Sequence, residues 1–377
     1  MHSTHSHTQA ETNARHGTVF TAPGPFRLES GAVLSRLDIA YTTHGQLNSE
    51  GTNAVLVCHA LTGNAHAADA ALSNGETIPG WFSGVIGPHR GLDTRRHCVI
   101  TSNILGSCYG TTGPTSINPS TSTPYRTSFP AITVRDMVRA QKLLLDHLGV
   151  RRLVTVIGGS LGGMQALEWA ILFPEMVESI IPIATSARHS AWCIGISETQ
   201  RLAIMNDPTW QEGNYTEQPA HGLAIARGIA MIWYRSRASF EDRFGRSTPS
   251  VGDGHERIQL FARSQLDWKV ESYLRYQGQK LVDRFDANTY ITLTRAMDAH
   301  DIGSGRGPVK DVLGDITARL LAIGISSDVL YPVEEQKALA SLTPRGEYAE
   351  LSSPQGHDAF LIEFEWMNEV LRRFLPQ

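Results

Sequence analysis

The chain has little of what marks several large protein classes. Its 377 residues include four cysteines, Cys58, Cys98, Cys108 and Cys193, too few for a disulfide framework and without a C-x-x-C pair. We therefore expect no metal site. With 33 basic and 37 acidic residues, the formal charge is −4, which disfavours nucleic acid as a partner. No apolar run reaches 18 residues, and the N-terminus lacks an apolar signal segment. The sequence thus predicts no contact with a membrane and a cytoplasmic location.

The remaining composition is that of a globular protein. Hydrophobic residues make up 41% and charged residues 19%, which excludes collagen-like and coiled-coil chains. The length allows one large α/β domain or two smaller ones. Residues 1–17 are polar and contain four histidines, so we expect a disordered tail there.

Short apolar runs alternate with helical patterns along most of the chain. Strands are predicted at residues 53–61, 97–105, 153–157, 177–184, 320–325 and 347–351. Thr133 and Asp136 resemble a capping box that opens a helix ending near Gly149. Spacings of three and four between apolar residues from Phe360 to Phe374 predict a final helix. Because several strands are apolar throughout, we expect an α/β fold with a mostly parallel central sheet flanked by helices.

The interval 189–300 departs from this alternation. It has no clear buried strand, yet it holds 13 of the 29 aromatic residues. We therefore predict a helical lid with its own small core at residues 189–300. The α/β core domain would then comprise residues 18–188 and 301–377.

A serine lies in the sharpest local motif, Gly158-Gly159-Ser160-Leu161-Gly162. The pentapeptide follows a predicted strand and precedes a predicted helix, which is the context of the G-x-S-x-G nucleophile elbow. Flanking glycines allow so tight a turn, because larger side chains would collide there. The pattern predicts Ser160 as a nucleophile. The alternative is a glycine-rich strand–helix turn that packs closely or binds phosphate.

A serine nucleophile requires a base and a group that orients the base. In the α/β-hydrolase order, the acid follows the elbow and the histidine comes last. Asp328 follows the strand at 320–325, and His357 precedes the final helix. Both positions lie at the same predicted sheet edge as Ser160. Asp315 is the rival acid, but it precedes its strand and belongs to the opposite edge.

Acyl chemistry also requires backbone donors for the developing oxyanion. The residue after the nucleophile, Leu161, supplies one N–H group. The second is predicted to come from Leu61, in the turn that follows the strand at 53–61. An ordinary strand–helix turn is the alternative for that segment.

Several motifs together resemble the homoserine O-acyltransferase family. They are His59–Gly63, Gly106–Pro114, the elbow with Gly163-Met164-Gln165, Glu271–Gly278 and Gly356–Asp358. The resemblance covers about residues 26–375. It implies an α/β-hydrolase fold with a helical lid, acyl transfer from acyl-CoA to an amino-acid hydroxyl, and the triad of Ser160, Asp328 and His357.

The resemblance also implies how the substrates are held. Arg227 and Tyr234 in the lid, with Asp358 beside the histidine, match the positions that hold the acceptor amino acid. A planar guanidinium suits a carboxylate, and the Asp358 charge suits an ammonium group. A lid surface salt bridge is the alternative for Arg227. The family further implies a homodimer, with the aromatic lid as the expected contact.

The function that we expect is ping-pong transfer of acetyl from acetyl-CoA to L-homoserine in methionine biosynthesis, without a permanently bound cofactor. Residues 231–236 resemble members that act on serine or larger alcohols, and Leu161 stands where methionine is common. Transfer to L-serine, or from succinyl-CoA, therefore stays open. A plain serine hydrolase would use the same triad, and a non-catalytic binding module would require a broken one.

Overall fold

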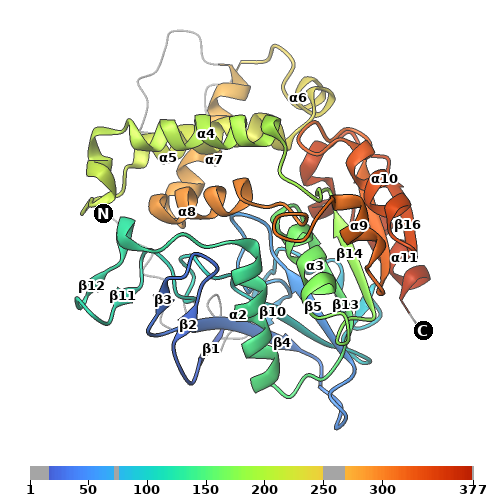
Figure 1. The fold of residues 1–377 in the computed structure, drawn as a ribbon. Coiled ribbons are helices and arrows are strands. Elements are labelled where there is room, and N and C mark those ends of the chain that lie inside the picture. The colour runs from blue at the N-terminus through green and yellow to red at the C-terminus, as the bar shows by residue number, and fades with distance from the viewer. Residues whose placement is uncertain (1–16, 72–75, 249–267, 376–377) are drawn as a thin grey trace.

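Eight strands form one sheet at the centre of the molecule (Figure 1). The structure is a computed structural model that describes residues 17–71, 76–248 and 268–375. Nearly all of the predicted tail therefore lies outside the described residues. In spatial order the strands are β1 (Thr18–Thr21), β4 (Asp38–His44), β10 (Cys98–Ser102), β5 (Ala54–Cys58), β13 (Leu153–Gly159), β14 (Ser179–Ile183), β15 (Arg319–Ile325) and β16 (Gly346–Leu351).

The pairing confirms a mostly parallel sheet. The six strands from β10 to β16 run parallel, while β1 and β4 add an antiparallel edge. Strands β5, β10, β13 and β14 are buried along their whole length, as expected where helices cover both faces. Two predicted strands were too long, because residues 59–61 and 103–105 already belong to the turns after β5 and β10.

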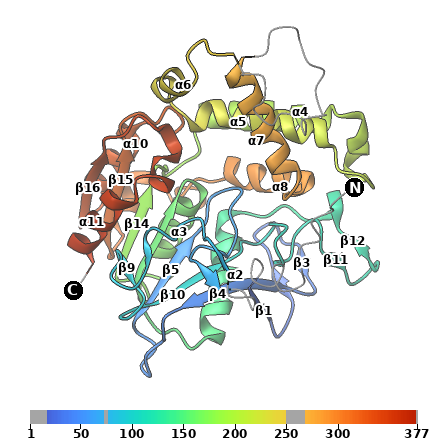
Figure 2. The ribbon, with the colours of Figure 1, turned by 180° about the vertical axis from the view of Figure 1, so that it is seen from behind.

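Helices cover both faces of this sheet (Figure 2). One apolar cluster packs α2 (Val134–His147), α3 (Leu161–Leu172), α9 (Val309–Gly314) and α10 (Val333–Leu342) against one face. A second cluster packs α11 (Phe364–Phe374) against the other face. Residues such as Leu56 and Val57 alternate between the two clusters, as successive strand residues must. The capping box before α2 is confirmed, because Thr133 and Asp136 exchange side-chain and backbone hydrogen bonds.

Short elements complete the core domain. The two-stranded pairs are β2 (Phe26–Arg27) with β3 (Val33–Leu34), β6 (Ala70–Ala71) with β7 (Thr77–Ile78), β8 (Ile86–Gly87) with β9 (Leu92–Asp93), and β11 (Ile117–Asn118) with β12 (Thr123–Pro124). Segments of 3-10 helix occur at η1 (Arg126–Ser128) and η4 (Gly356–Leu361) in the core domain and at η2 (Pro208–Gly213) in the lid. Among the described helices, none combines the length and the apolar character that crossing a bilayer requires.

The final helix starts later than its apolar spacing predicted. Phe360 belongs to the 3-10 turn η4, and α11 begins at Phe364. Phe360 is nevertheless buried in the same cluster as Met367 and Leu371. The spacing thus identified the buried face but not the break between α11 and the 3-10 turn that contains His357.

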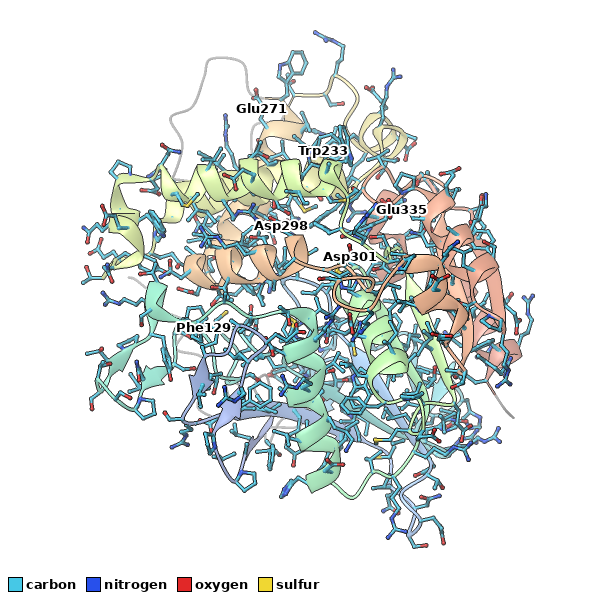
Figure 3. The ribbon with its side chains drawn as sticks, viewed as in Figure 1. Phe129, Trp233, Glu271, Asp298, Asp301 and Glu335 are labelled. Carbon is cyan, nitrogen blue, oxygen red and sulfur yellow. The ribbon has the colours of Figure 1, made fainter. Side chains whose placement is uncertain are left out.

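The lid layer consists of helices over the described part of residues 189–300 (Figure 1). They are α4 (Ala191–Met205), α5 (Ala220–Tyr234), α6 (Arg237–Arg243), α7 (Lys269–Val282) and α8 (Ala287–Asp298). A bridge pairs Arg188 with Asp301, so the chain leaves and rejoins the core at one place. Asp298 and Asp301 mark this return in Figure 3.

The expectation of a separate lid core was wrong. One continuous apolar cluster includes Ile204, Leu223 and Tyr290 of the lid together with Ile104 and Met137 of the core domain. The aromatic and aliphatic lid residues thus bury their surface against the core domain as well as against each other. Because burial of apolar surface drives packing, this shared cluster holds the lid over the sheet.

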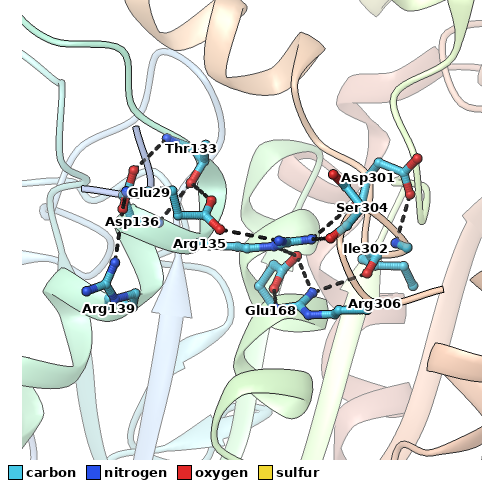
Figure 4. Close-up of polar contacts among 11 residues, drawn as sticks. Glu29, Thr133, Arg135, Asp136, Arg139, Glu168, Asp301, Ile302, Ser304 and Arg306 are labelled. Carbon is cyan, nitrogen blue, oxygen red and sulfur yellow. Dashed lines mark hydrogen bonds and ion pairs between the residues drawn. The ribbon is translucent and has the colours of Figure 1, made fainter. Parts of the chain in front are cut away.

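A buried ion pair network fixes the returning chain to the core (Figure 4). Glu168 on α3 is 1% exposed and pairs with Arg135 of α2 at 3.1 Å and with Arg306 at 2.8 Å. Arg135 also donates to the carbonyl oxygens of Asp301 and Ser304. The chain that returns from the lid is therefore anchored to α3, the helix that follows Ser160.

Candidate active site

Ser160 stands at the sharp turn between β13 and α3. Its backbone has φ 57° and ψ −124°, a strained conformation for a residue with a side chain. Hydrogen bonds hold this turn: the Ser160 N–H donates to Ile183 O at 2.9 Å, and the Thr185 hydroxyl donates to Ser160 O at 2.9 Å. The predicted strand–turn–helix context of the elbow is confirmed.

The glycines beside Ser160 are required by close backbone contacts. A Cβ atom on Gly162 would lie 2.1 Å from Cys58 O, and one on Gly158 would lie 2.5 Å from the Gly162 backbone. A Cβ atom on Gly159 would meet the Phe360 ring at 2.4 Å. The elbow is therefore packed directly against β5 on one side and against η4 on the other.

Asp328 and His357 form a buried hydrogen-bonded pair. The His357 Nδ1 atom lies 2.7 Å from Asp328 Oδ2, and both side chains are less than 5% exposed. The other Asp328 oxygen accepts the N–H groups of Leu330 and Tyr331, at 2.8 and 3.0 Å. These contacts fix the carboxylate, which in turn assigns the Nδ1 proton and leaves Nε2 available as a base.

Two tyrosine rings flank the imidazole of His357. The ring centroids of Tyr234 and Tyr331 lie 5.6 and 5.4 Å from that of His357. Burial by itself lowers the pKa of His357, but the charge and hydrogen bond of Asp328, with a contribution from Asp358, raise it above the ordinary value of 6.5. The surroundings therefore favour the imidazolium that forms when the ring accepts a proton.

The rival acid, Asp315, lies at the opposite end of β15 from Asp328. Asp315 caps the C-terminal end of α9, before β15 begins at Arg319. Asp328 follows the carboxyl end of the same strand. The structure thus brings Asp328, and not Asp315, to the histidine.

Of the two predicted oxyanion donors, Leu161 lies within the elbow and Leu61 lies in the turn after β5. Leu161 is the first residue of α3, where backbone amides have no partner within the helix. Leu61 belongs to the turn Ala60–Gly63, which is closed by a 2.9 Å bond from Gly63 N to Ala60 O. Leu61 lines the same cavity as Ser160, and Leu161 directly follows Ser160 in the chain; their role as oxyanion donors stays a prediction.

A cavity of about 200 Å³ joins these groups with the predicted acceptor residues. Fifteen residues line it: Cys58, Ala60, Leu61, Thr62, Gly63, Trp81, Gly159, Ser160, Arg227, Tyr234, Arg284, His357, Asp358, Phe360 and Leu361. The Arg227 guanidinium lies 5.5 Å from the centroid of the Tyr234 ring. Asp358 is 3.5 Å from the Nε atom of Arg235. Two arginines, Arg227 and Arg284, and one carboxylate, Asp358, thus line the cavity that contains Ser160.

Sequence reasoning missed two residues of this cavity, Trp81 and Arg284. Trp81 Nε1 donates to Asn64 O at 3.0 Å, and Arg284 donates to Thr62 O at 2.7 Å. These contacts span 17 and 222 residues of the chain, so no short motif contains both partners of either contact. Within the described residues, no group of three or more His, Cys, Asp or Glu side chains could hold a metal ion.

Comparison with known proteins extends these observations. The family model described as alpha/beta hydrolase fold matches residues 53–364. A homoserine O-acetyltransferase of Trichormus variabilis is 53% identical over 354 residues, which are 93% of this chain and 92% of that protein.

Solved structures share the same architecture. The crystal structure of homoserine O-acetyltransferase from Bacillus anthracis has a TM-score of 0.86 and 28% identity, covering 96% of this chain and 98% of that one. The structure of esterase E22 has a TM-score of 0.84 and 28% identity, covering 95% and 99%. The 53% identity to the Trichormus variabilis enzyme extends over more than nine-tenths of both chains. The protein therefore belongs to the homoserine O-acetyltransferase family of the α/β-hydrolase fold.

Proposed function

We propose that this protein transfers an acetyl group from acetyl-CoA to the hydroxyl of L-homoserine, with Ser160 carrying the acetyl group between the two substrates. The observation that carries the proposal is a single cavity in which Ser160 and His357, bonded to Asp328, face Arg227 and Asp358. The 53% identical homoserine O-acetyltransferase supports the same acceptor and reaction.

In the first half-reaction, His357 Nε2 removes the proton from the Ser160 hydroxyl. The Ser160 oxygen attacks the thioester carbonyl carbon, and the Leu61 and Leu161 amides stabilise the oxyanion. The intermediate then collapses, the C–S bond breaks, and His357 returns the proton to the CoA thiolate. Ser160 is left as an acetyl ester.

In the second half-reaction, the same groups act on homoserine. His357 accepts the proton of the substrate hydroxyl, whose oxygen attacks the acetyl carbon of Ser160. The ester bond to Ser160 breaks, the Ser160 oxygen recovers its proton from His357, and O-acetylhomoserine leaves. Because Ser160 carries the acetyl group, this route requires no resident cofactor, and acetyl-CoA is a co-substrate.

Charge complementarity supports an amino acid as the acceptor. Arg227 presents a planar cation to the cavity, which suits the two oxygens of an α-carboxylate. Asp358 presents an anion, which suits the α-ammonium group. A simple alcohol or water offers neither a carboxylate for Arg227 nor an ammonium group for Asp358, so these residues favour an amino-acid hydroxyl.

A serine hydrolase is the second candidate, and the similarity to esterase E22 favours it. The two functions differ in the fate of the acetyl-enzyme, because a hydrolase releases CoA without an acceptor. We would measure thiol release from acetyl-CoA and from succinyl-CoA with homoserine, with serine and with neither. Release that depends on homoserine and acetyl-CoA supports our proposal, whereas equal release without an acceptor would identify a hydrolase.

The covalent intermediate provides a direct test of Ser160. Mass spectrometry after mixing with acetyl-CoA alone should show one added acetyl group on Ser160. Ser160→Ala should keep the fold and lose this adduct, because the hydroxyl is the attacking group. An adduct that persists in the Ala variant would disprove the assignment.

The lid supports the further proposal of a homodimer. Of twelve exposed large apolar side chains among the described residues, six lie on α4, α5 and α7: Trp192, Ile194, Leu202, Ile225, Ile232 and Tyr276. Clustered exposed apolar residues mark protein interfaces. We also propose that the protein works in the cytoplasm, where acetyl-CoA is available.

A further inference from the structure

The turn that carries Leu61 is anchored to the core through a histidine. The His59 Nε2 atom accepts the Ile104 N–H at 3.1 Å, so Nδ1 must carry the ring proton, and it lies 2.8 Å from Ala60 O. Burial lowers the pKa of His59 to about 4, which keeps this ring neutral near pH 7. The contacts of His59 therefore fix the first half of the turn Ala60–Gly63 to the core domain.

The second half of the turn is held from the lid. Arg284, which follows α7, donates through Nη1 to Thr62 O at 2.7 Å and to the Tyr109 hydroxyl at 2.8 Å. Its Nη2 atom lies 3.4 Å from Thr62 Oγ1. The next residue, Phe285, is 2% exposed and packs edge-on against Tyr109, with 5.8 Å between the ring centroids. The packing of Phe285 thus fixes the backbone from which the Arg284 side chain extends.

These contacts distinguish Arg284 from the other arginine of the cavity. The Nη1 atom of Arg284 has two hydrogens, and both are used on protein acceptors. The Arg227 guanidinium instead faces the Tyr234 ring and the open cavity. Arg227 is therefore placed to bind a substrate, while Arg284 is placed to hold the protein.

We propose that Arg284 is a positioning residue that fixes the Leu61 amide in the oxyanion hole by clamping the adjacent residue Thr62 to the lid. This inference rests on the proposed acyl-transfer chemistry. Oxyanion donors act through preorganisation, so loosening the turn weakens stabilisation of the transition state more than it weakens substrate binding. The lid and the catalytic turn are thereby joined through one side chain.

The test compares two acyl donors in the full-length enzyme. Arg284→Met removes the clamp and keeps the length of the side chain. Arg36→Met is the matched control, because Arg36 is an exposed arginine that pairs with Asp38 outside the cavity. Stopped-flow kinetics would follow acylation of Ser160 by acetyl-CoA and by p-nitrophenyl acetate, which has no CoA portion.

We expect Arg284→Met to slow acylation from both donors by the same factor, about 10- to 100-fold, since complete loss of one oxyanion donor costs about 10²–10³. KM for homoserine should change less than about twofold, and the melting temperature should match that of the control. Arg284→Lys should recover part of the rate, because an ammonium can still donate to Thr62 O.

Three results would overturn the proposal. A loss confined to acetyl-CoA would assign Arg284 to CoA binding, and a loss confined to transfer would assign it to the acceptor. A loss matched by a fall in melting temperature would assign it to folding. Failure of the proposed function can be distinguished from failure of this inference. If the wild-type enzyme did not transfer acetyl to homoserine, the effect of Arg284→Met on acylation by p-nitrophenyl acetate could still be measured.

Discussion

The protonation of His357 depends on its burial and on the Asp328 carboxylate. Burial alone would hold the ring neutral, yet the Asp328 charge raises the pKa of His357 above 6.5. The folded state therefore binds the proton more tightly than the unfolded state does. His357 stabilises the fold fully below about pH 6.5, and this contribution is lost as the pH rises through the folded pKa.

Catalysis has the opposite pH dependence, because only neutral His357 can accept a proton. Acylation of Ser160 should rise with pH through an apparent pKa above 6.5. Asp328→Asn should lower that apparent pKa and slow acylation by at least about 10²; the corresponding change in a serine protease costs about 10⁴. Rates with acetyl-CoA measured across pH 5–9 would check both effects.

Asp315→Asn is the control for this experiment, because Asp315 caps α9 before β15 begins. Its pH profile should match that of the wild type. If Asp315→Asn were the damaging change and Asp328→Asn the mild one, the assignment of the acid would be wrong.

Arg227 should affect only the second half-reaction. Arg227→Ala should form the acetyl-enzyme at a nearly normal rate, because acetyl-CoA has no α-carboxylate. Loss of one charged hydrogen bond costs about 1.5–3 kcal/mol, so kcat/KM for homoserine should fall roughly 10- to 150-fold. Arg227→Lys should recover part of this loss, since lysine lacks the planar fork. Single-turnover measurements of each step would reveal a slow first step, which would contradict the assignment.

The sequence carried different amounts of information about different site residues. Ser160 could be predicted because its tight turn imposes glycines at neighbouring positions. Asp328 and His357 followed from chain order, since each comes after a strand whose carboxyl end meets the same sheet edge. Arg284 has no such local requirement, because its partners Thr62 and Tyr109 lie more than 170 residues away in the chain. Only the folded structure places it.

At the scale of single elements, the junction of α3 with β5 depends on the absence of a side chain. A Cβ atom on Gly162 would lie 2.1 Å from Cys58 O, and backbone atoms cannot rotate away. Gly162→Ala should therefore lower the free energy of unfolding by about 1–3 kcal/mol, as overpacked sites do. It should also slow acylation, because Cys58 precedes the turn that carries Leu61.

Gly314→Ala is the matched substitution for this test. Gly314 lies at the end of α9 with no atom within 4 Å of an added Cβ. There the methyl group should stabilise the fold by about 0.4–1 kcal/mol, by restricting the unfolded chain. Urea unfolding of both variants gives the comparison. An unchanged urea midpoint and full activity in Gly162→Ala would contradict the packing argument.

Element boundaries were harder to predict than element positions. Apolar spacing placed Phe360, Met367 and Leu371 on one buried face, and the structure agrees. The same spacing could not show that Phe360 lies in a separate 3-10 turn, since a turn and a helix can bury the same face. The break falls at Ile362 and Glu363, between the 3-10 turn that contains His357 and α11.

At the scale of the whole molecule, the lid and the core domain share one apolar cluster. The excess of aromatic residues in 189–300 indicated burial but not the surface against which those residues are buried. The structure places lid residues such as Leu223 and Tyr290 with Met137 of α2. Composition can therefore indicate that a segment is packed, while the surface against which it packs depends on the fold.

The outer surface of α5 exposes apolar side chains where we propose the contact with a second copy of the chain. Ile225 and Ile232 on α5 are seven residues apart, hence on one face of the helix, and are 45% and 52% exposed. Gly228 between them has open space around it. A helix of another subunit could approach closely there, because a glycine adds no side chain to the surface.

Ile225→Asp should therefore weaken the proposed homodimer. Burying an unpaired carboxylate in an apolar contact is strongly unfavourable, and a loss of about 1.4–3 kcal/mol would raise the dimer dissociation constant roughly 10- to 150-fold. Sedimentation velocity at several concentrations would measure this change. Val33→Asp is the control, because Val33 is 50% exposed on β3, outside the lid residues 189–300.

Acylation by p-nitrophenyl acetate separates assembly from catalysis in the same samples. Ile225 does not line the cavity that contains Ser160, so a monomeric Ile225→Asp variant should still acylate Ser160 at a nearly normal rate. A wild-type enzyme that sediments as a monomer, or an Ile225→Asp variant that stays as dimeric as Val33→Asp, would show that the lid stripe is not the subunit contact.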